Sequence, residues 1–177
     1  GLHLVATANA EMVMLANENP TLHSILNNAS LVVPDGAGIL WAAERQGEYV
    51  PERVTGVDVT KELFKVAATH QIPVYCLGAA PGVAQRAIDN VSAQVGVLNI
   101  AGIHDGFFDS AEEQEIIKSI AESKAKLVFV ALGVPKQEQW IAEKLSHLDG
   151  VVAIGIGGSF DVLAGNIPRA PEWMQQN

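Results

Sequence analysis

The sequence has very little cysteine and no long hydrophobic run. Cys76 is the one cysteine among 177 residues, so no disulfide can form within a chain, which is typical of a reducing, cytoplasmic compartment. Its place inside the apolar run Val74–Leu77 predicts a buried, unreactive thiol. We recognise no signal peptide and no apolar stretch long enough to span a bilayer.

Basic residues are also scarce. The chain has 11 lysines and arginines against 20 aspartates and glutamates, a formal net charge of −9. This balance argues against nucleic acid as a partner and against docking on anionic lipid through this part of the chain. With 49% hydrophobic residues, positions 1–177 are long enough to form a single domain with a sizeable core.

The motifs of common cofactor sites are missing. No Gly-x-x-x-x-Gly-Lys-Ser/Thr loop is present, and the absence of Gly-x-Gly-x-x-Gly argues against a nicotinamide cofactor. The five histidines are scattered, and none is spaced from Cys76 as zinc ligands are. We therefore expect no bound metal or cofactor.

Short apolar runs alternate with amphipathic segments along the chain. This alternation predicts an α/β fold: a Rossmann-like, doubly wound, mainly parallel sheet of about six strands with helices on both faces. The irregular stretch Gly47–Gly56 is a candidate active-site loop. The expected strands are Leu2–Ala8, Leu31–Val33, Val74–Leu77, Val97–Ala101, Leu127–Leu132 and Val151–Ile156. The expected helices lie near Ala10–Asn17, Thr21–Asn28, Gly38–Gln46, Val57–His70, Pro81–Val95, Ser110–Ser123, Pro135–Leu148 and Ser159–Ala164.

Asp35 stands where an apolar run ends in a glycine-broken turn, between Pro34 and Gly36. In an open α/β sheet, ligands bind in the crevice outside the carboxyl ends of the strands. A carboxylate there is a candidate base, although a helix N-cap is an equally good explanation from sequence alone. Thr7 and Asn9 end the first strand, and they offer a hydroxyl and an amide to a substrate oxygen or to a helix cap.

Glycine-rich turns follow three further strands. Small residues there let backbone N–H groups approach a phosphate at a helix N-terminus, so these turns are candidate nucleotide-binding loops, with a plain tight turn as the alternative. The candidate residues are Gly78, Gly82, Gly102, Gly158, Ser159, Phe160 and Asp161.

Several longer polar side chains are candidate substrate ligands. His104 lies in a turn with two aromatic residues, and it would bond a phosphate or a base edge. Lys136 and Gln137 follow Pro135 at a helix start and suit a sugar or a phosphate. Arg53, in the irregular loop, would pair with a phosphate or carboxylate, or else be an ordinary surface arginine. The residues alone thus predict an α/β protein that binds a phosphorylated, nucleotide-like ligand.

Six segments occur in a fixed order: Thr7–Val13, Pro34–Ile39, Arg53–Asp58, His104–Phe108, Gly133–Glu138 and Gly157–Asp161. This pattern closely resembles the TagA/WecG/CpsF family of bacterial glycosyltransferases (glycosyltransferase family 26), over essentially the whole chain. The closest resemblance is to the branch that builds the wall teichoic acid linkage unit. It implies transfer of N-acetylmannosamine from its UDP donor to undecaprenyl-diphosphate-linked N-acetylglucosamine, forming a β-1,4 bond with inversion.

The resemblance also implies roles for individual residues. Asp35 would be the general base, Thr7 and Asn9 would position the sugar or acceptor in the catalytic centre, and Gln137 would hold a sugar hydroxyl. Arg53 and the turns at Gly78 and Gly158 would offset the charge that grows on UDP. Many glycosyltransferases bind a metal through Asp-x-Asp, which this sequence lacks, so we expect metal-independent transfer without a cofactor.

Members of the family continue beyond the region of Pro171–Trp173 with a basic and apolar tail that is thought to touch the membrane and to contribute arginines. This chain ends at Asn177, so we expect it to bind UDP but to transfer sugar poorly by itself. The full-length protein would lie peripherally on the inner face of the plasma membrane. Apolar surface left uncovered by a missing tail would favour a homo-oligomer.

Two alternatives remain open at this stage. The first is the same chemistry with another UDP-sugar donor, carrying N-acetylmannosaminuronic acid or glucose. The second is a non-catalytic, nucleotide-binding or nicotinamide-dependent module of ordinary Rossmann type.

Overall fold

The structure is a computed structural model, and it describes residues 1–52 and 54–169. Its six strands form one parallel sheet in the order β2-β1-β6-β5-β3-β4. The central strands β3 and β5 are buried at every position, as expected for apolar strands that are covered on both faces. The strand bounds are β1 Leu2–Ala8, β2 Leu31–Pro34, β3 Val74–Gly78, β4 Ile100–His104, β5 Leu127–Ala131 and β6 Val151–Gly155.

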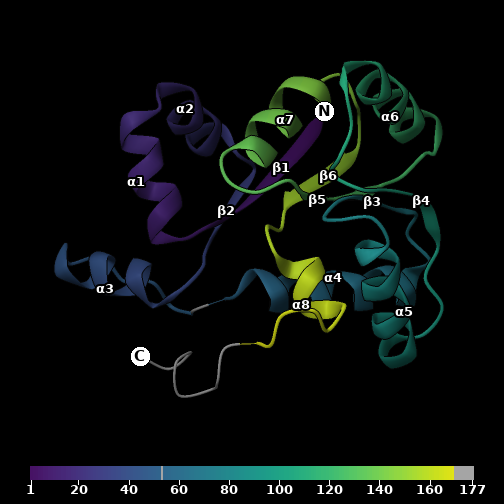
Figure 1. Ribbon diagram of the computed structural model, residues 1–177. Helices are drawn as coiled ribbons and strands as arrows, with labels where there is room; N and C mark the ends of the chain where they lie inside the picture. Colours follow the sequence, from purple (N-terminus) through teal and green to yellow (C-terminus); the bar gives the residue numbers. More distant parts are fainter. Residues whose placement is uncertain (53, 170–177) are drawn as a thin grey trace.

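Helices cover both faces of the sheet (Figure 1). One layer contains α1 (Ala10–Glu18), α2 (Pro20–Asn28), α6 (Ser110–Glu122) and α7 (Lys136–Lys144). The other contains α4 (Gly56–His70), α5 (Val83–Val95) and the short α8 (Ser159–Leu163). The remaining helix, α3 (Ala37–Arg45), lies beside the β2 edge of the sheet and buries none of its residues. The predicted fold class, a doubly wound α/β sheet with helices on both faces, is confirmed.

The two helical layers enclose separate hydrophobic cores, one on each face of the sheet. On one face, Ile141 of α7 and Leu145, the C-cap of that helix, are fully buried in a core with residues of β1, β5 and β6. On the other, Phe129 of β5 packs against Phe64 of α4, with ring centroids 4.6 Å apart, and against Phe160 of α8. Cys76 lies in this second core with no exposed surface, and burial raises the pKa of its thiol, as expected for an unreactive cysteine.

Local polar contacts fix where several helices begin. Asn9 caps α1 by accepting a hydrogen bond from Met12 N at 2.8 Å, and Thr55 caps α4 by accepting one from Asp58 N at 3.1 Å. Asp109 and Glu112 form a capping box at the start of α6. In each of these helices, at least one N–H group of the first turn is therefore bonded by a cap side chain.

One predicted strand was displaced. The sequence favoured Val97–Ala101, whereas β4 runs from Ile100 to His104. Val97 is 79% exposed and follows Gly96, so it belongs to the turn after α5 rather than to the sheet. Pairing of Cys76 with Ile103 and of Leu77 with His104 then makes His104 the last residue of β4 rather than part of the turn after it.

Gly78, at the end of β3, tests the packing of the strand ends. Its φ is +123°, and an added Cβ would lie 2.3 Å from Ala131 O of the neighbouring strand β5. Gly78→Ala combines backbone strain with this overlap, so we expect a loss of about 4 kcal/mol or more in the free energy of unfolding. Urea denaturation followed by circular dichroism would measure the loss.

Gly96→Ala is the matched control, because Gly96 also has a positive φ, +100°, but no atom lies within 4 Å of its added Cβ. This variant should lose only the cost of the backbone strain, about 1–3 kcal/mol. Equal losses in the two variants would show that the contact with Ala131 contributes nothing.

Candidate active site

A pocket of about 450 Å³ opens at the carboxyl ends of β1 and β6, close to the end of β2. This is the edge of a parallel α/β sheet at which ligands bind. The parallel pairing of β1 with β2 and with β6 brings together segments that are up to about 160 residues apart in the chain. The lining residues are Thr7, Asn9, Asp35, Thr55, Gly56, Val57, Val134, Gln137, Ile156, Gly157, Gly158, Ser159, Val162, Ile167 and Arg169.

Asp35 is held in this pocket by backbone contacts on two sides. Its own N–H donates to Ala8 O at 2.8 Å, which continues the pairing of β1 with β2. Its Oδ2 accepts a hydrogen bond from the backbone N–H of Gly56, the first residue of α4, at 3.2 Å. The alternative role as cap of the following helix is not what the structure shows, because Gly36 is the N-cap of α3 and that helix has no side-chain cap.

Three side-chain oxygens converge above Gly56. A Cβ at this position would lie 3.4 Å from Asp35 Oδ2, 3.5 Å from Thr7 Oγ1 and 3.6 Å from Ser159 Oγ. These oxygens come from the β2–α3 turn, from β1 and from the start of α8. The position therefore gathers a carboxylate and two hydroxyls around one small volume at the pocket.

Thr7 and Asn9 occupy the end of β1 as predicted, but they are held differently. Thr7 is buried, and its hydroxyl donates to Gly155 O of β6 at 3.3 Å, which joins the two strands that frame the pocket. Asn9 lines the pocket and also caps α1 through Met12 N. The capping role considered for Asn9 is thus confirmed, and its substrate-binding role stays a prediction.

Gln137 lies at the start of α7 with only 1% of its surface exposed, yet it lines the pocket. Its Oε1 accepts a hydrogen bond from Gly157 N at 3.0 Å, and its Nε2 donates to Glu138 Oε1 at 2.8 Å. Glu138 is fully buried, and this burial raises the pKa of its carboxyl group. The Gln137 side chain thereby links α7 to the β6–α8 turn.

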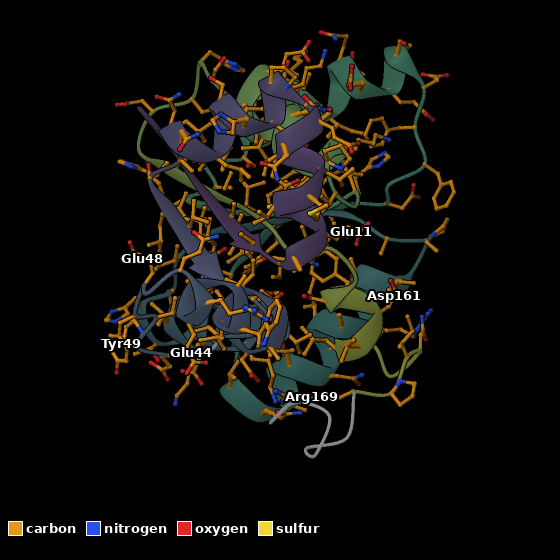
Figure 2. The ribbon with its side chains drawn as sticks, turned by 90° about the vertical axis from the view of Figure 1, so that its left-hand side faces the viewer. Glu11, Glu44, Glu48, Tyr49, Asp161 and Arg169 are labelled. Atoms are coloured by element: carbon orange, nitrogen blue, oxygen red, sulfur yellow. The ribbon has the colours of Figure 1, made fainter. Side chains whose placement is uncertain are left out.

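Arg169 supplies a cation at the rim of the pocket. Its Nη2 bonds Asp58 Oδ2 at 2.6 Å, and Asp58 Oδ2 also accepts from Thr55 Oγ1 at 2.8 Å. Figure 2 shows Arg169 on the side of the molecule that also carries Glu11 and Glu44, from which it lies apart. An arginine at the rim of a pocket is chemically suited to bind a phosphate or a carboxylate of a ligand.

Residues of the β6–α8 turn divide between the pocket and the core. Gly158 and Ser159 line the pocket, and the Ser159 hydroxyl donates to Ile156 O at 2.6 Å. Phe160 has no exposed surface and packs on Phe129, so it contributes to the core. Asp161 is half-buried on α8 and is not a lining residue.

Three predicted nucleotide-binding glycines are not among the lining residues: Gly78 ends β3, Gly82 lies in the turn after it and Gly102 lies within β4. Gly82 is the N-cap of α5, with φ of +81°, and Gly78 lies against Ala131 as described above. Gly102 faces Tyr75, whose Cε2 would lie 2.3 Å from an added Cβ. Close packing accounts for Gly78 and Gly102, and the nucleotide-binding role of all three glycines stays a prediction.

His104 and Lys136 also lie outside the lining. His104 borders a second cavity with Tyr75 and Glu112, and its Nδ1 lies 2.9 Å from Asp105 O. Lys136 is exposed, with its ammonium group 5.5 Å from the centre of the Phe108 ring. The structure thus brings Thr7, Asn9, Asp35, Gln137, Gly158 and Ser159 together and leaves these two residues aside.

The sequence analysis overlooked four residues of the site. Arg53 lies outside the described residues. The overlooked residues are Thr55, Gly56, Glu138 and Arg169. In the sequence, Pro168 and Pro171 flank Arg169 and Ala170, which predicts an irregular segment. Only the fold brings Arg169 to Asp58.

Two further observations concern the described residues only. Among residues 1–52 and 54–169, no group of three or more histidine, cysteine, aspartate or glutamate side chains is placed to hold a metal ion. No helix in this part of the chain is both long enough and apolar enough to cross a membrane. The expected metal independence stays a prediction.

Known proteins resemble the chain along its whole length. The sequence matches the "Glycosyl transferase WecG/TagA/CpsF family" over residues 1–177. Three relatives are each named N-acetylglucosaminyldiphosphoundecaprenol N-acetyl-beta-D-mannosaminyltransferase. The relative from Bacillus subtilis (strain 168) is 33% identical over 171 residues, which are 97% of this chain and 66% of the relative.

The other two relatives have similar sequence identity and coverage. The relative from Bacillus spizizenii (strain ATCC 23059 / NRRL B-14472 / W23) is 36% identical, with 96% of this chain and 68% of the relative covered. The relative from Staphylococcus aureus (strain NCTC 8325 / PS 47) is 32% identical, with 94% and 65% covered. The chain therefore spans about two thirds of the length of these relatives. Since the family match extends from the first residue to the last, the chain belongs to the WecG/TagA/CpsF family of glycosyl transferases.

Proposed function

We propose that this chain carries the catalytic domain of an inverting glycosyltransferase of wall teichoic acid linkage-unit synthesis. Its donor would be UDP-N-acetylmannosamine and its acceptor undecaprenyl-diphosphate-linked N-acetylglucosamine, joined through a β-1,4 bond. The names of the relatives support this sugar and this acceptor. The observation that carries the proposal is the convergence of Asp35, Thr7 and Ser159 oxygens in a pocket at the ends of β1 and β6.

Asp35 would act as the general base. In an inverting transfer, the acceptor hydroxyl oxygen attacks the anomeric carbon from the face opposite the diphosphate. The new carbon–oxygen bond forms as the bond to the β-phosphate oxygen breaks, and that oxygen keeps the electron pair. The proton of the acceptor hydroxyl passes to the Asp35 carboxylate, which the hydrogen bond from Gly56 N holds in place.

The departing diphosphate requires positive partners. Arg169 lines the pocket and is held at its rim by Asp58, so it would stabilise charge that grows on UDP. The backbone N–H groups of the Gly157–Ser159 turn would add further hydrogen bonds. With these groups in place, the transfer would proceed without a metal ion or other cofactor.

The acceptor would determine where the protein works. Its polyprenyl chain resides in a membrane, so the full-length protein would meet its acceptor as a peripheral protein on the cytoplasmic face. The net charge of −9 opposes attraction to anionic lipid through this part of the chain. Recognition of the acceptor would therefore depend on its sugar diphosphate and on apolar contacts.

Binding of UDP by this chain in the presence of EDTA is the first test. Calorimetric titration should show saturable binding, because the proposed donor site uses protein groups rather than a metal. Arg169→Gln removes the charged partner of the diphosphate, so UDP affinity should fall by about 10–100-fold.

Arg45→Gln is the matched control, since Arg45 lies on α3 over the Trp41 ring and does not line the pocket. It should leave UDP affinity unchanged. Binding of NAD(H) in place of UDP would contradict the glycosyltransferase proposal and favour a nicotinamide-dependent module. Equal losses in the two arginine variants would contradict the assignment of UDP to this pocket.

Asp35→Asn tests the assignment of the base. The substitution preserves the shape of the side chain but removes its ability to take a proton, so turnover should fall by about 10²–10⁴-fold while UDP affinity changes little. Turnover is to be measured as UDP release in a chain extended to the full length of the relatives, with undecaprenyl-diphosphate-linked N-acetylglucosamine as acceptor. Asp89→Asn, an exposed carboxylate on α5 bonded by Gln85, is the control. Undiminished turnover in Asp35→Asn would place the base elsewhere.

A further inference from the structure

Glu138 is a buried ionisable group that the proposed reaction does not use. It lies in the first turn of α7 with no exposed surface. Its Oε1 accepts the hydrogen bond from Gln137 Nε2 at 2.8 Å, whereas its Oε2 is buried and has no hydrogen-bond partner within the described part of the chain. Burying a carboxylate with an unpaired oxygen is unfavourable, and an apolar side chain would fill the same space at lower cost.

The contact of Glu138 with Gln137 points to a structural role for this carboxyl group. A side-chain amide has a donor end and an acceptor end, and it is easily turned over unless its neighbours distinguish them. The Glu138 Oε1 atom accepts a hydrogen bond here, with or without a proton on Oε2, so Glu138 selects the nitrogen of Gln137. Gly157 N–H only donates, at 3.0 Å, so it selects the oxygen. Both neighbours impose the same orientation on the amide, and the reversed orientation would place donor against donor and acceptor against acceptor.

The end of β6 leaves space for the side chains of Gln137 and Glu138. A Cβ on Gly155, the last residue of β6, would lie 2.6 Å from Glu138 Oε1 and 2.7 Å from Gln137 Nε2. Gly155 has no positive φ, so its lack of a side chain provides space rather than backbone freedom. Its carbonyl oxygen also accepts the Thr7 hydroxyl hydrogen bond. The Glu138–Gln137 pair thus contacts the same residue that joins β6 to β1 at the pocket.

We propose that Glu138 is a positioning residue, whose Oε1 fixes the orientation of the Gln137 amide and, through it, the Gly157 turn at the pocket. The second Nε2 hydrogen of Gln137 and the second lone pair of Gln137 Oε1 are then left for a ligand. Glu138 itself has no access to the pocket and touches no reacting atom. The link from this orientation to sugar binding rests on the proposed function, whereas the orientation itself does not.

The test compares Glu138→Met, which keeps the bulk but has no strong acceptor, with Glu138→Gln, which keeps an acceptor oxygen. Amide hydrogen exchange by NMR would follow Gly157 N–H. In Glu138→Met, exchange of Gly157 should accelerate about tenfold or more, because the Gln137 amide loses the hydrogen bond from its Nε2 and is free to turn. Glu138→Gln should restore protection close to that of the wild type.

An internal reference separates this effect from general loosening of the fold. Gly106 N–H donates to Ala79 O at 2.8 Å at the β3–β4 end of the sheet, so its exchange should not change in either variant. Glu143→Gln, which alters an exposed carboxylate on the same helix, should leave both amides as in the wild type. Full protection of Gly157 in Glu138→Met would show that Glu138 only fills space and would overturn the proposal. Equal loss in the Met and Gln variants would overturn the role of the acceptor.

Gly155→Ala provides a second route if Glu138→Met does not fold. The added methyl group would displace the same pair with Glu138 intact, so exchange of Gly157 should again accelerate, and unchanged protection would contradict the proposal. UDP titration of the same variants tests the effect on ligand binding. The affinity for UDP should be about tenfold lower in Glu138→Met and restored in Glu138→Gln. If the wild type binds no UDP, the proposed function fails, whereas the exchange data still decide the role of Glu138.

Discussion

The parallel pairing of β1 with β6 is the constraint on which the candidate site depends. These strands lie near the two ends of the chain, yet Ala6 stands opposite Gly155, so Thr7 and the Gly157 turn leave the sheet side by side. Pairing of Ala8 with Pro34 adds the Asp35 turn on the other side of β1. Because parallel strands all end at one edge, these pairings are sufficient to bring together polar groups from distant segments. A shift of register between β1 and β6 by one residue would separate the Thr7 hydroxyl from Gly155 O and turn the side chains to the opposite faces.

Two glycines contribute to this edge of the sheet because they leave space for other groups. Gly56 leaves the volume where three oxygens converge, and Gly155 leaves the volume that the Glu138–Gln137 pair occupies. The helices then determine the polarity of the pocket. α4 directs its first N–H toward Asp35, and α7 brings the Gln137 amide to the Gly157 N–H. In a chain of net charge −9, an anionic ligand would have to find positive partners locally, and Arg169 with backbone N–H groups would meet this need where the overall field does not.

The sequence predicts the fold class and six of the fifteen residues that line the pocket, for clear physical reasons. Continuous apolar runs such as Leu127–Ala131 identify parallel strands, and polar residues directly after such runs, as with Thr7 and Asp35, identify the edge where ligands bind. Strand order, by contrast, has no local pattern. All strand ends look equivalent in sequence, so the pattern groups Gly78 and Gly102 with Gly158, although β5 separates β3 from β6 and Gly102 lies within β4. Glu138 and Arg169 were overlooked because burial and ion pairing depend on tertiary contacts.

The surroundings of the nearby carboxylates favour Asp35 as the base independently of its place in a motif. Among the described residues that line the pocket, Asp35 is the acidic one. Glu138 is fully buried beside Gln137 and does not line the pocket, so it is not placed to take a proton from a substrate. Asp58 is engaged by Arg169 and by the Thr55 hydroxyl, so taking up a proton would break an ion pair that holds the pocket cation. A base must reach the proton that it removes. In the proposed mechanism, three carboxylates of similar intrinsic chemistry would therefore have three different tasks: Asp35 would take the proton, Asp58 would hold the cation in place and Glu138 would orient an amide.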